Sequence, residues 1–182
     1  MTGRKSRDMK SENGEGTRDT FVSQDRQFTA RVLKGSTDPF YTRLEAANRN
    51  VFLGARFLNA VERHLLHKPD RLVLVGVADM VGKPIALFAF VRRRRFGVDV
   101  LEGLDLGIAD YFAPALFQDE PLSPKETANV WRAAVKTVPG VHAVSFKKMP
   151  RLLHGVPNAL TGAEFVKPMG ASATTLSLRH QD

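Results

Sequence analysis

The chain has no cysteine among its 182 residues, which excludes disulfides, a cysteine nucleophile and a thiolate metal site. Long apolar runs are also missing, because Asp79 and Lys83 break the longest candidate well short of the roughly 20 residues of a membrane-spanning helix. The first residues contain no apolar segment of the kind that signal peptides carry. These absences predict a cytoplasmic protein without a transmembrane segment.

Motifs of several enzyme classes are missing too. The sequence contains no phosphate-binding P-loop and no serine nucleophile elbow. His64 and His67 have a spacing that can ligate a metal from one helix, but the sequence indicates no further ligand for them. We therefore expect no metal site.

Positive charge is in excess, with a formal net charge of +8 at pH 7. This excess is compatible with binding to nucleic acid, to anionic small molecules or to a membrane surface, and also with simple solubility. The sequence shows no helix-turn-helix and no basic strand with interleaved aromatic residues. Nucleic acid is therefore an unlikely partner on sequence grounds.

The centre of the sequence predicts an antiparallel meander of three strands. Two apolar runs, Leu72–Ala78 and Ile85–Val91, are separated by a short connection that contains Gly, and a third strand is expected at Val98–Leu101. Such runs between turn residues are typical of strands buried on both faces. A polar loop from Leu104 to Tyr111 follows.

The segments around the meander predict flanking helices and further strands. Residues 1–20 are polar and are expected to form a disordered tail. An edge strand is expected at Phe28–Leu33, and a helix start at Ser36–Pro39 is followed by apolar residues at helical spacing as far as Val51. A second helix is expected at Gly54–His67.

The C-terminal third contains the clearest local signal. Ser123-Pro124-Lys125-Glu126 predicts a capping box with proline at the first helical position, and Trp131 falls on the apolar face of that helix. Strands are expected at Val141–Phe146 and Thr174–Leu178. This order of elements predicts an α/β (α+β) fold with a mixed, mainly antiparallel sheet flanked by helices.

Several segments, taken in order, resemble one family of bacterial proteins. They are the hairpin VLVGVADMVGKPIALFAFVRRRR, the run Leu101–Leu104 that leads to Ala109–Pro114, and Val51-Phe52-Leu53 with the helix behind it. Val144–Phe146, Met149-Pro150 and Pro157-Asn158 fit the same pattern. The chain is thus similar to the N-terminal half of the cellulose-biosynthesis acetyltransferase-like proteins of the CelD/BcsL type, which belong to the GNAT superfamily.

The resemblance implies a fold and an activity. It implies one GNAT-like domain over residues 21–182, as the first half of a tandem-GNAT architecture that a second half or a partner chain completes. The implied reaction transfers an acyl group from acetyl-CoA or another acyl-CoA to an amine or hydroxyl acceptor, a small molecule or a saccharide. Exopolysaccharide or cell-envelope synthesis is the implied setting.

One departure from the superfamily pattern opens an alternative function. In GNAT proteins a Gly-rich turn at a helix N-terminus holds the CoA pyrophosphate, which orphan amides and the helix dipole favour. The nearest match, Arg95–Asp99, falls in a predicted hairpin with no helix behind it. The alternative is a non-catalytic GNAT-like binding module that does not bind CoA.

Two groups of residues are candidates for the site. The four consecutive arginines Arg92, Arg93, Arg94 and Arg95 are candidates to bind the phosphates of CoA, or otherwise form a solvated strand end that discourages edge pairing. Asp110 and Tyr111 stand where the resemblance places a recurrent Asp-Tyr pair, and a carboxylate there is a candidate general base. The alternative is an Asp that caps a turn and a Tyr that packs its ring.

Overall fold

The computed structural model describes residues 26–45, 50–107, 112–117, 122–153, 156–158 and 161. The expected tail at 1–20 and the expected last strand at Thr174–Leu178 lie outside these ranges. The helices within them are too short or too polar to serve as membrane spans.

The described chain folds around one mixed sheet. Its strand order is β1-β2-β3-β4-β6, with β5 paired to β3 on the same edge as β4, and every pairing is antiparallel except β4 with β6. A separate hairpin is formed by β7 and β8. The strand bounds are β1 Phe28–Val32, β2 Arg71–Asp79, β3 Pro84–Arg95, β4 Val98–Gly103, β5 Ala115–Leu116, β6 Ala143–Ser145, β7 Leu152–Leu153 and β8 Val156–Pro157.

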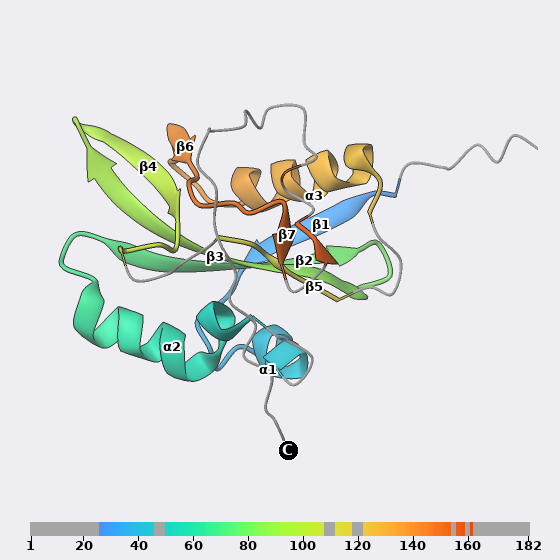
Figure 1. Cartoon of the computed structure of the whole chain (residues 1–182), viewed down its shortest axis with the longest axis horizontal. Coiled ribbons are helices and arrows are strands. Elements are labelled where there is room, and N and C mark those ends of the chain that lie inside the picture. The colour runs from blue at the N-terminus through green and yellow to red at the C-terminus, as the bar shows by residue number, and fades with distance from the viewer. Residues whose placement is uncertain are drawn as a thin grey trace, which may run out of the picture.

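Helices cover both faces of this sheet, as Figure 1 shows, with α1 and α2 on one side and α3 on the other. The bounds are α1 Pro39–Glu45, α2 Ala55–Ala60 and α3 Pro124–Lys136. A short 3-10 helix at Val51–Leu53 precedes α2, and a π-helical turn at Val61–Leu65 extends it. The predicted α+β class with a mainly antiparallel, helix-flanked sheet is confirmed.

The predicted meander is confirmed as β2, β3 and β4, with β2 and β3 at the centre of the sheet. Because side chains alternate along a strand, β3 contributes to a core on each face. Leu87, Ala89 and Val91 pack with α1 and α2, whereas Phe88 and Phe90 pack with α3. All residues from Ile85 to Val91 are buried, which explains why the run reads as continuously apolar.

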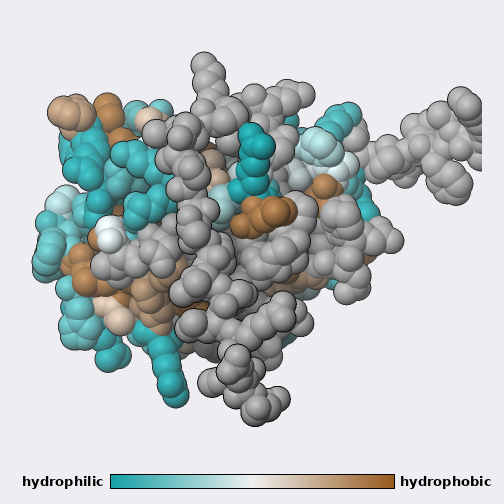
Figure 2. Space-filling model, viewed as in Figure 1, coloured by the Kyte–Doolittle hydropathy of each residue, from teal (hydrophilic) through white to brown (hydrophobic). Residues whose placement is uncertain are grey.

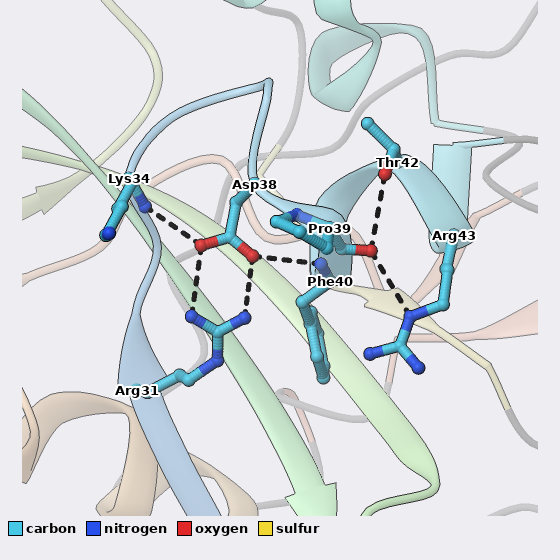
Figure 3. Close-up of polar contacts among 7 residues, drawn as sticks. All are labelled: Arg31, Lys34, Asp38, Pro39, Phe40, Thr42 and Arg43. Carbon is cyan, nitrogen blue, oxygen red and sulfur yellow. Dashed lines mark hydrogen bonds and ion pairs between the residues drawn. The ribbon is translucent and has the colours of Figure 1, made fainter.

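The start of α1 is fixed by a buried carboxylate, Asp38, shown in Figure 3. Its Oδ1 accepts from the Phe40 N–H at 2.9 Å, its Oδ2 from the Lys34 N–H at 3.2 Å, and Arg31 donates two further bonds at 2.6 and 3.0 Å. The hydrogen bond from Arg31, aided by those from the two amides, lowers the pKa of Asp38 to about 2 although burial opposes the shift. The predicted helix start is confirmed.

The first helix is shorter than predicted. Its described part is Pro39–Glu45, Asn50 is already extended, and Val51, expected on its apolar face, is 68% exposed. The reason is a new cap, because the side chain of Asn50 accepts from the Phe52 N–H and starts the 3-10 turn there. The helical spacing of apolar residues predicted as far as Val51 therefore extends past the first helix into the 3-10 turn.

The other two helices agree more closely with the sequence. The predicted helix at Gly54–His67 is found as α2 and its π-helical continuation. In α3 the capping box is complete, since Ser123 Oγ accepts from the Glu126 N–H and the Glu126 carboxylate accepts from the Ser123 N–H. Trp131 is buried in the core as predicted.

Candidate anion-binding site

The four arginines occupy the last four positions of β3. This strand pairs with β4 along the whole arginine run. On its other edge β2 begins opposite Arg92, so among the described residues Arg93–Arg95 have a partner strand on one edge only. The edge-protection interpretation therefore stays open beside a binding role. Alternation places Arg92 and Arg94 on the α3 side of the sheet and Arg93 and Arg95 on the α2 side. The four side chains therefore form two pairs rather than one cluster.

The α3-side pair surrounds one carboxylate. Arg92 Nη2 lies 2.5 Å from Asp99 Oδ2, and its Nη1 donates to the Pro139 carbonyl oxygen at 3.1 Å. Arg94 is the cross-strand neighbour of Asp99. The hydrogen bond from Arg92, with the charges of Arg92 and Arg94, lowers the pKa of the Asp99 carboxyl, so Asp99 is ionised at neutral pH.

The α2-side pair is neutralised by two other carboxylates. Arg93 Nε lies 2.7 Å from Asp70 Oδ2, and its Nη1 lies 3.3 Å from Glu102 Oε2. Arg95 Nε lies 3.4 Å from Glu102 Oε1. These ion pairs tie β3 to β4 and to the segment before β2, so this half of the quartet has a structural role.

A hollow of about 250 Å³ opens beside the arginines. It is lined by Pro69, Arg71, Arg92, Arg93, Arg94 and Asp99. Arg71 enters this lining because it lies opposite Arg92 in the register of β2 and β3. Four guanidinium groups and one carboxylate give the wall a formal charge of 4 − 1 = +3.

Two of these arginines are available to a ligand. Within the described residues, Arg71 and Arg94 have no carboxylate within 4 Å, whereas Arg92 has one and Arg93 has two. Like charges held together repel, and an anion in the hollow relieves that repulsion. A planar guanidinium also matches the oxygens of phosphate or carboxylate. The geometry therefore fits a small anionic group.

Asp110 and Tyr111 lie outside the described residues, so the general-base hypothesis stays a prediction. The segment directly after them is well anchored. The Phe112 N–H donates to the Lys148 carbonyl oxygen at 2.8 Å, and the buried side chains of Asn158 and Asn50 donate to the carbonyl oxygens of Phe112 and Ala113 at 3.2 and 3.1 Å. Segments far apart in sequence thus hold Phe112 and Ala113 in place.

The N-terminus of α3 and the Arg95–Asp99 stretch do not offer free backbone amides to a phosphate. At the N-terminus of α3 the Glu126 carboxylate caps the helix and pairs with Arg26 at 3.0 Å, which leaves the positive end of the dipole neutralised. The Arg95–Asp99 stretch forms the hairpin turn, with Phe96 and Gly97 both at positive φ. Neither has the amides of a phosphate-binding turn free at a helix start.

Metal coordination has no visible basis in the described part of the chain. No group of three or more His, Asp or Glu side chains placed to share an ion occurs there. His142 instead pairs with Asp99. Its side-chain Nδ1 accepts from the Asp99 backbone N–H at 3.3 Å, and its backbone N–H donates to the Asp99 carbonyl oxygen at 2.9 Å.

Comparisons with protein-family models, with curated proteins and with solved structures gave no match. The resemblance to the CelD/BcsL-type proteins therefore stays a prediction from the motifs.

Sequence reasoning missed Arg71 and the three carboxylates that partner the arginines. Arg71 could not have been found by extending the predicted hairpin, because the pairing next to the Asp79–Lys83 turn would place residue 71 opposite residue 91, and a β-bulge between Val77 and Ala78 shifts it opposite Arg92. Asp99, by contrast, follows from the two-residue turn at Phe96-Gly97, which places it opposite Arg94. The hydrogen bonds of Asn50 to Ala113 and of Asn158 to Phe112 carried no such signal, since in each the two residues lie more than 40 positions apart.

Proposed function

We propose that the hollow binds the phosphate groups of an acyl-CoA and that the protein acts as a GNAT-like acyltransferase. The observation that carries this proposal is the uneven charge of the hollow, in which Arg71 and Arg94 have no carboxylate partner among the described residues. Arg92 and Arg93, held by Asp99 and Asp70, would shape the wall and contact the ligand only secondarily.

The reaction would be a direct transfer. The acceptor nitrogen or oxygen attacks the thioester carbonyl, a base removes its proton, and the carbon–sulfur bond breaks to release CoA as a thiolate that is then protonated. The family resemblance supports Asp110 as that base, with Tyr111 beside it. It also supports a saccharide or amine acceptor in exopolysaccharide or envelope synthesis, and a second GNAT-like half as partner.

A non-catalytic binding module is the second candidate, and a specific observation favours it. The N-terminus of α3 is occupied by its own Glu126, and the Gly97 turn joins two strands. Within the described part of the chain, the CoA phosphates would therefore be held by arginine side chains and not by a turn of backbone amides. In this candidate the hollow binds a phosphorylated or carboxylated ligand other than CoA, and acyl transfer belongs to another chain.

Replacing the two available arginines should separate a ligand site from a structural cluster. We expect acetyl-CoA to bind saturably in isothermal titration, and Arg71→Ala and Arg94→Ala each to weaken binding by about tenfold or more, because each removes charge-assisted hydrogen bonds worth about 1.5–3 kcal/mol. Release of free CoA thiol with added acceptor measures transfer in the same samples.

Arg56→Ala is the matched control, since Arg56 is an exposed arginine on α2, away from the hollow. It should bind acetyl-CoA as the wild type does. If isothermal titration detects no binding at millimolar acetyl-CoA but detects Arg94-dependent binding of inorganic phosphate, the binding module would be favoured. Equal effects of Arg56→Ala and Arg94→Ala would show that only net charge matters and would refute the hollow as a site.

A further inference from the structure

The turn between β3 and β4 holds an aromatic ring out into solvent. Phe96 is fully exposed, and its φ of 50° is followed by a φ of 83° at Gly97. Positive φ at both central residues defines a type I′ turn, which favours Asn, Asp or Gly and disfavours a bulky side chain. Phe96 also makes no ring contact within the described part of the chain. Neither turn preference nor packing accounts for a phenyl ring there.

Cations and a second apolar side chain surround this ring. Arg94 and Arg95 precede the turn and are exposed, and Val98, directly after it, is 41% exposed. In Figure 1 the turn forms the upper-left extremity of the described chain, and Figure 2 shows brown surface at this corner bordered by teal. We define Phe96, Val98, Arg94 and Arg95 as the hairpin tip.

An apolar projection backed by arginines matches the surface of an anionic bilayer. Aromatic and aliphatic side chains lie favourably at the boundary between headgroups and acyl chains, and nearby arginines gain from the negative surface potential. Proteins that bind single-stranded nucleic acid instead line a groove with several rings. Within the described ranges Phe96 is the one exposed aromatic residue. The tip therefore fits a membrane better than a nucleic acid.

We propose that the hairpin tip docks the protein reversibly on anionic membranes. Phe96 and Val98 enter the headgroup boundary and Arg94 contacts lipid phosphates, while Arg95 stays paired with Glu102 at 3.4 Å. One ring and one valine bury little area, so binding is weak and requires the positive charge, as the net charge of +8 allows. This proposal does not depend on acyl-CoA binding.

Vesicle sedimentation with the full chain tests the proposal. We expect binding to vesicles of phosphatidylcholine with phosphatidylserine, weaker binding at high salt, and little binding to phosphatidylcholine alone. Phe96→Asn should weaken binding by about tenfold, the loss of roughly 1.4 kcal/mol of apolar insertion. Asparagine suits a type I′ turn, so the variant should fold at least as stably, which thermal unfolding checks.

Val81→Asn is the matched control, because Val81 is 89% exposed in the turn at the other end of β3. It should bind vesicles as the wild type does. Failure of the wild type to bind anionic vesicles would overturn the proposal, as would equal binding by Phe96→Asn. If the protein does not bind vesicles but shifts a labelled single-stranded oligonucleotide in a Phe96-dependent way, the membrane proposal would be overturned and nucleic acid would be the ligand of the hairpin tip.

Discussion

Phe90→Ala is expected to lower the free energy of unfolding by about 4 kcal/mol, in the range for a large aromatic residue truncated in a core. Phe90 is fully buried in the central strand β3. Its ring centroid lies 5.5 Å from that of Phe88, 6.1 Å from that of Trp131 and 5.7 Å from that of Phe146. Removing it leaves a cavity among rings that belong to three separate segments, so the site cannot collapse locally.

The substitution should also weaken the packing of the other segments that contact the Phe90 ring. Phe112 lies 6.0 Å from Phe90 and stacks on Phe146 at 5.1 Å, so β6 and the chain before β5 depend on the same cluster. Urea unfolding followed by Trp131 fluorescence measures the change. Phe90→Leu, with an expected loss of about 1.5 kcal/mol, keeps the test open if the alanine variant does not fold.

A Phe→Ala substitution at an exposed position is the control for Phe90→Ala. Phe96→Ala removes an equal ring that touches no core residue, and it should change the free energy of unfolding by about 0.5 kcal/mol or less. A loss below about 2 kcal/mol for Phe90→Ala, measured beside that control, would contradict the view that this aromatic cluster is central to the fold.

The central strands could be predicted from sequence because their physics is local. Leu72–Ala78 and Ile85–Val91 are apolar at nearly every position, so both faces of each strand carry apolar side chains. This pattern is expected of strands whose two faces are both covered. The capping box at Ser123 likewise depends on residues three positions apart. By contrast, the position of Val51 in a separate 3-10 turn depends on Asn50, whose side chain also donates to the Ala113 carbonyl oxygen across the fold. No local pattern reports such a contact.

The arginine run shows the same limit at the candidate site. Four identical residues carry no information about which of them are neutralised, and that division comes from strand alternation combined with register. Asp99 and Glu102 lie on opposite faces of β4 because their spacing is odd, so each serves a different pair of arginines. The sequence could predict a basic site there, whereas only the paired strands identify Arg71 and Arg94 as its available cations.

Asp38→Ala is expected to lower the free energy of unfolding by about 3 kcal/mol at pH 7, because it removes the acceptor of four hydrogen bonds at once. Asp38 is 3% exposed, so the amides of Lys34 and Phe40 lose their partner where water reaches poorly. The Arg31 side chain is 52% exposed and can be hydrated again, which keeps the loss near the lower end for a broken ion pair.

The pH dependence of this loss identifies its cause. The folded state lowers the pKa of Asp38 from 3.8 to about 2, so it binds that proton less tightly than the unfolded chain does. The stability that Asp38 contributes is therefore complete above about pH 4 and is lost as the pH falls through about 2. The difference between wild type and Asp38→Ala should narrow across this interval in urea unfolding curves.

Asp105→Asn supplies the matched control for that experiment. Asp105 forms an ion pair with Lys148 at 2.7 Å, but both side chains are partly exposed, so the variant should lose no more than about 0.5 kcal/mol. A gap between wild type and Asp38→Ala that stays constant from pH 7 to pH 3 would show that lost packing, and not the ionised carboxylate, sets the cost. Because Asp38 joins β1 to α1, a narrowing gap would instead mean that one buried charge holds the first helix against the sheet.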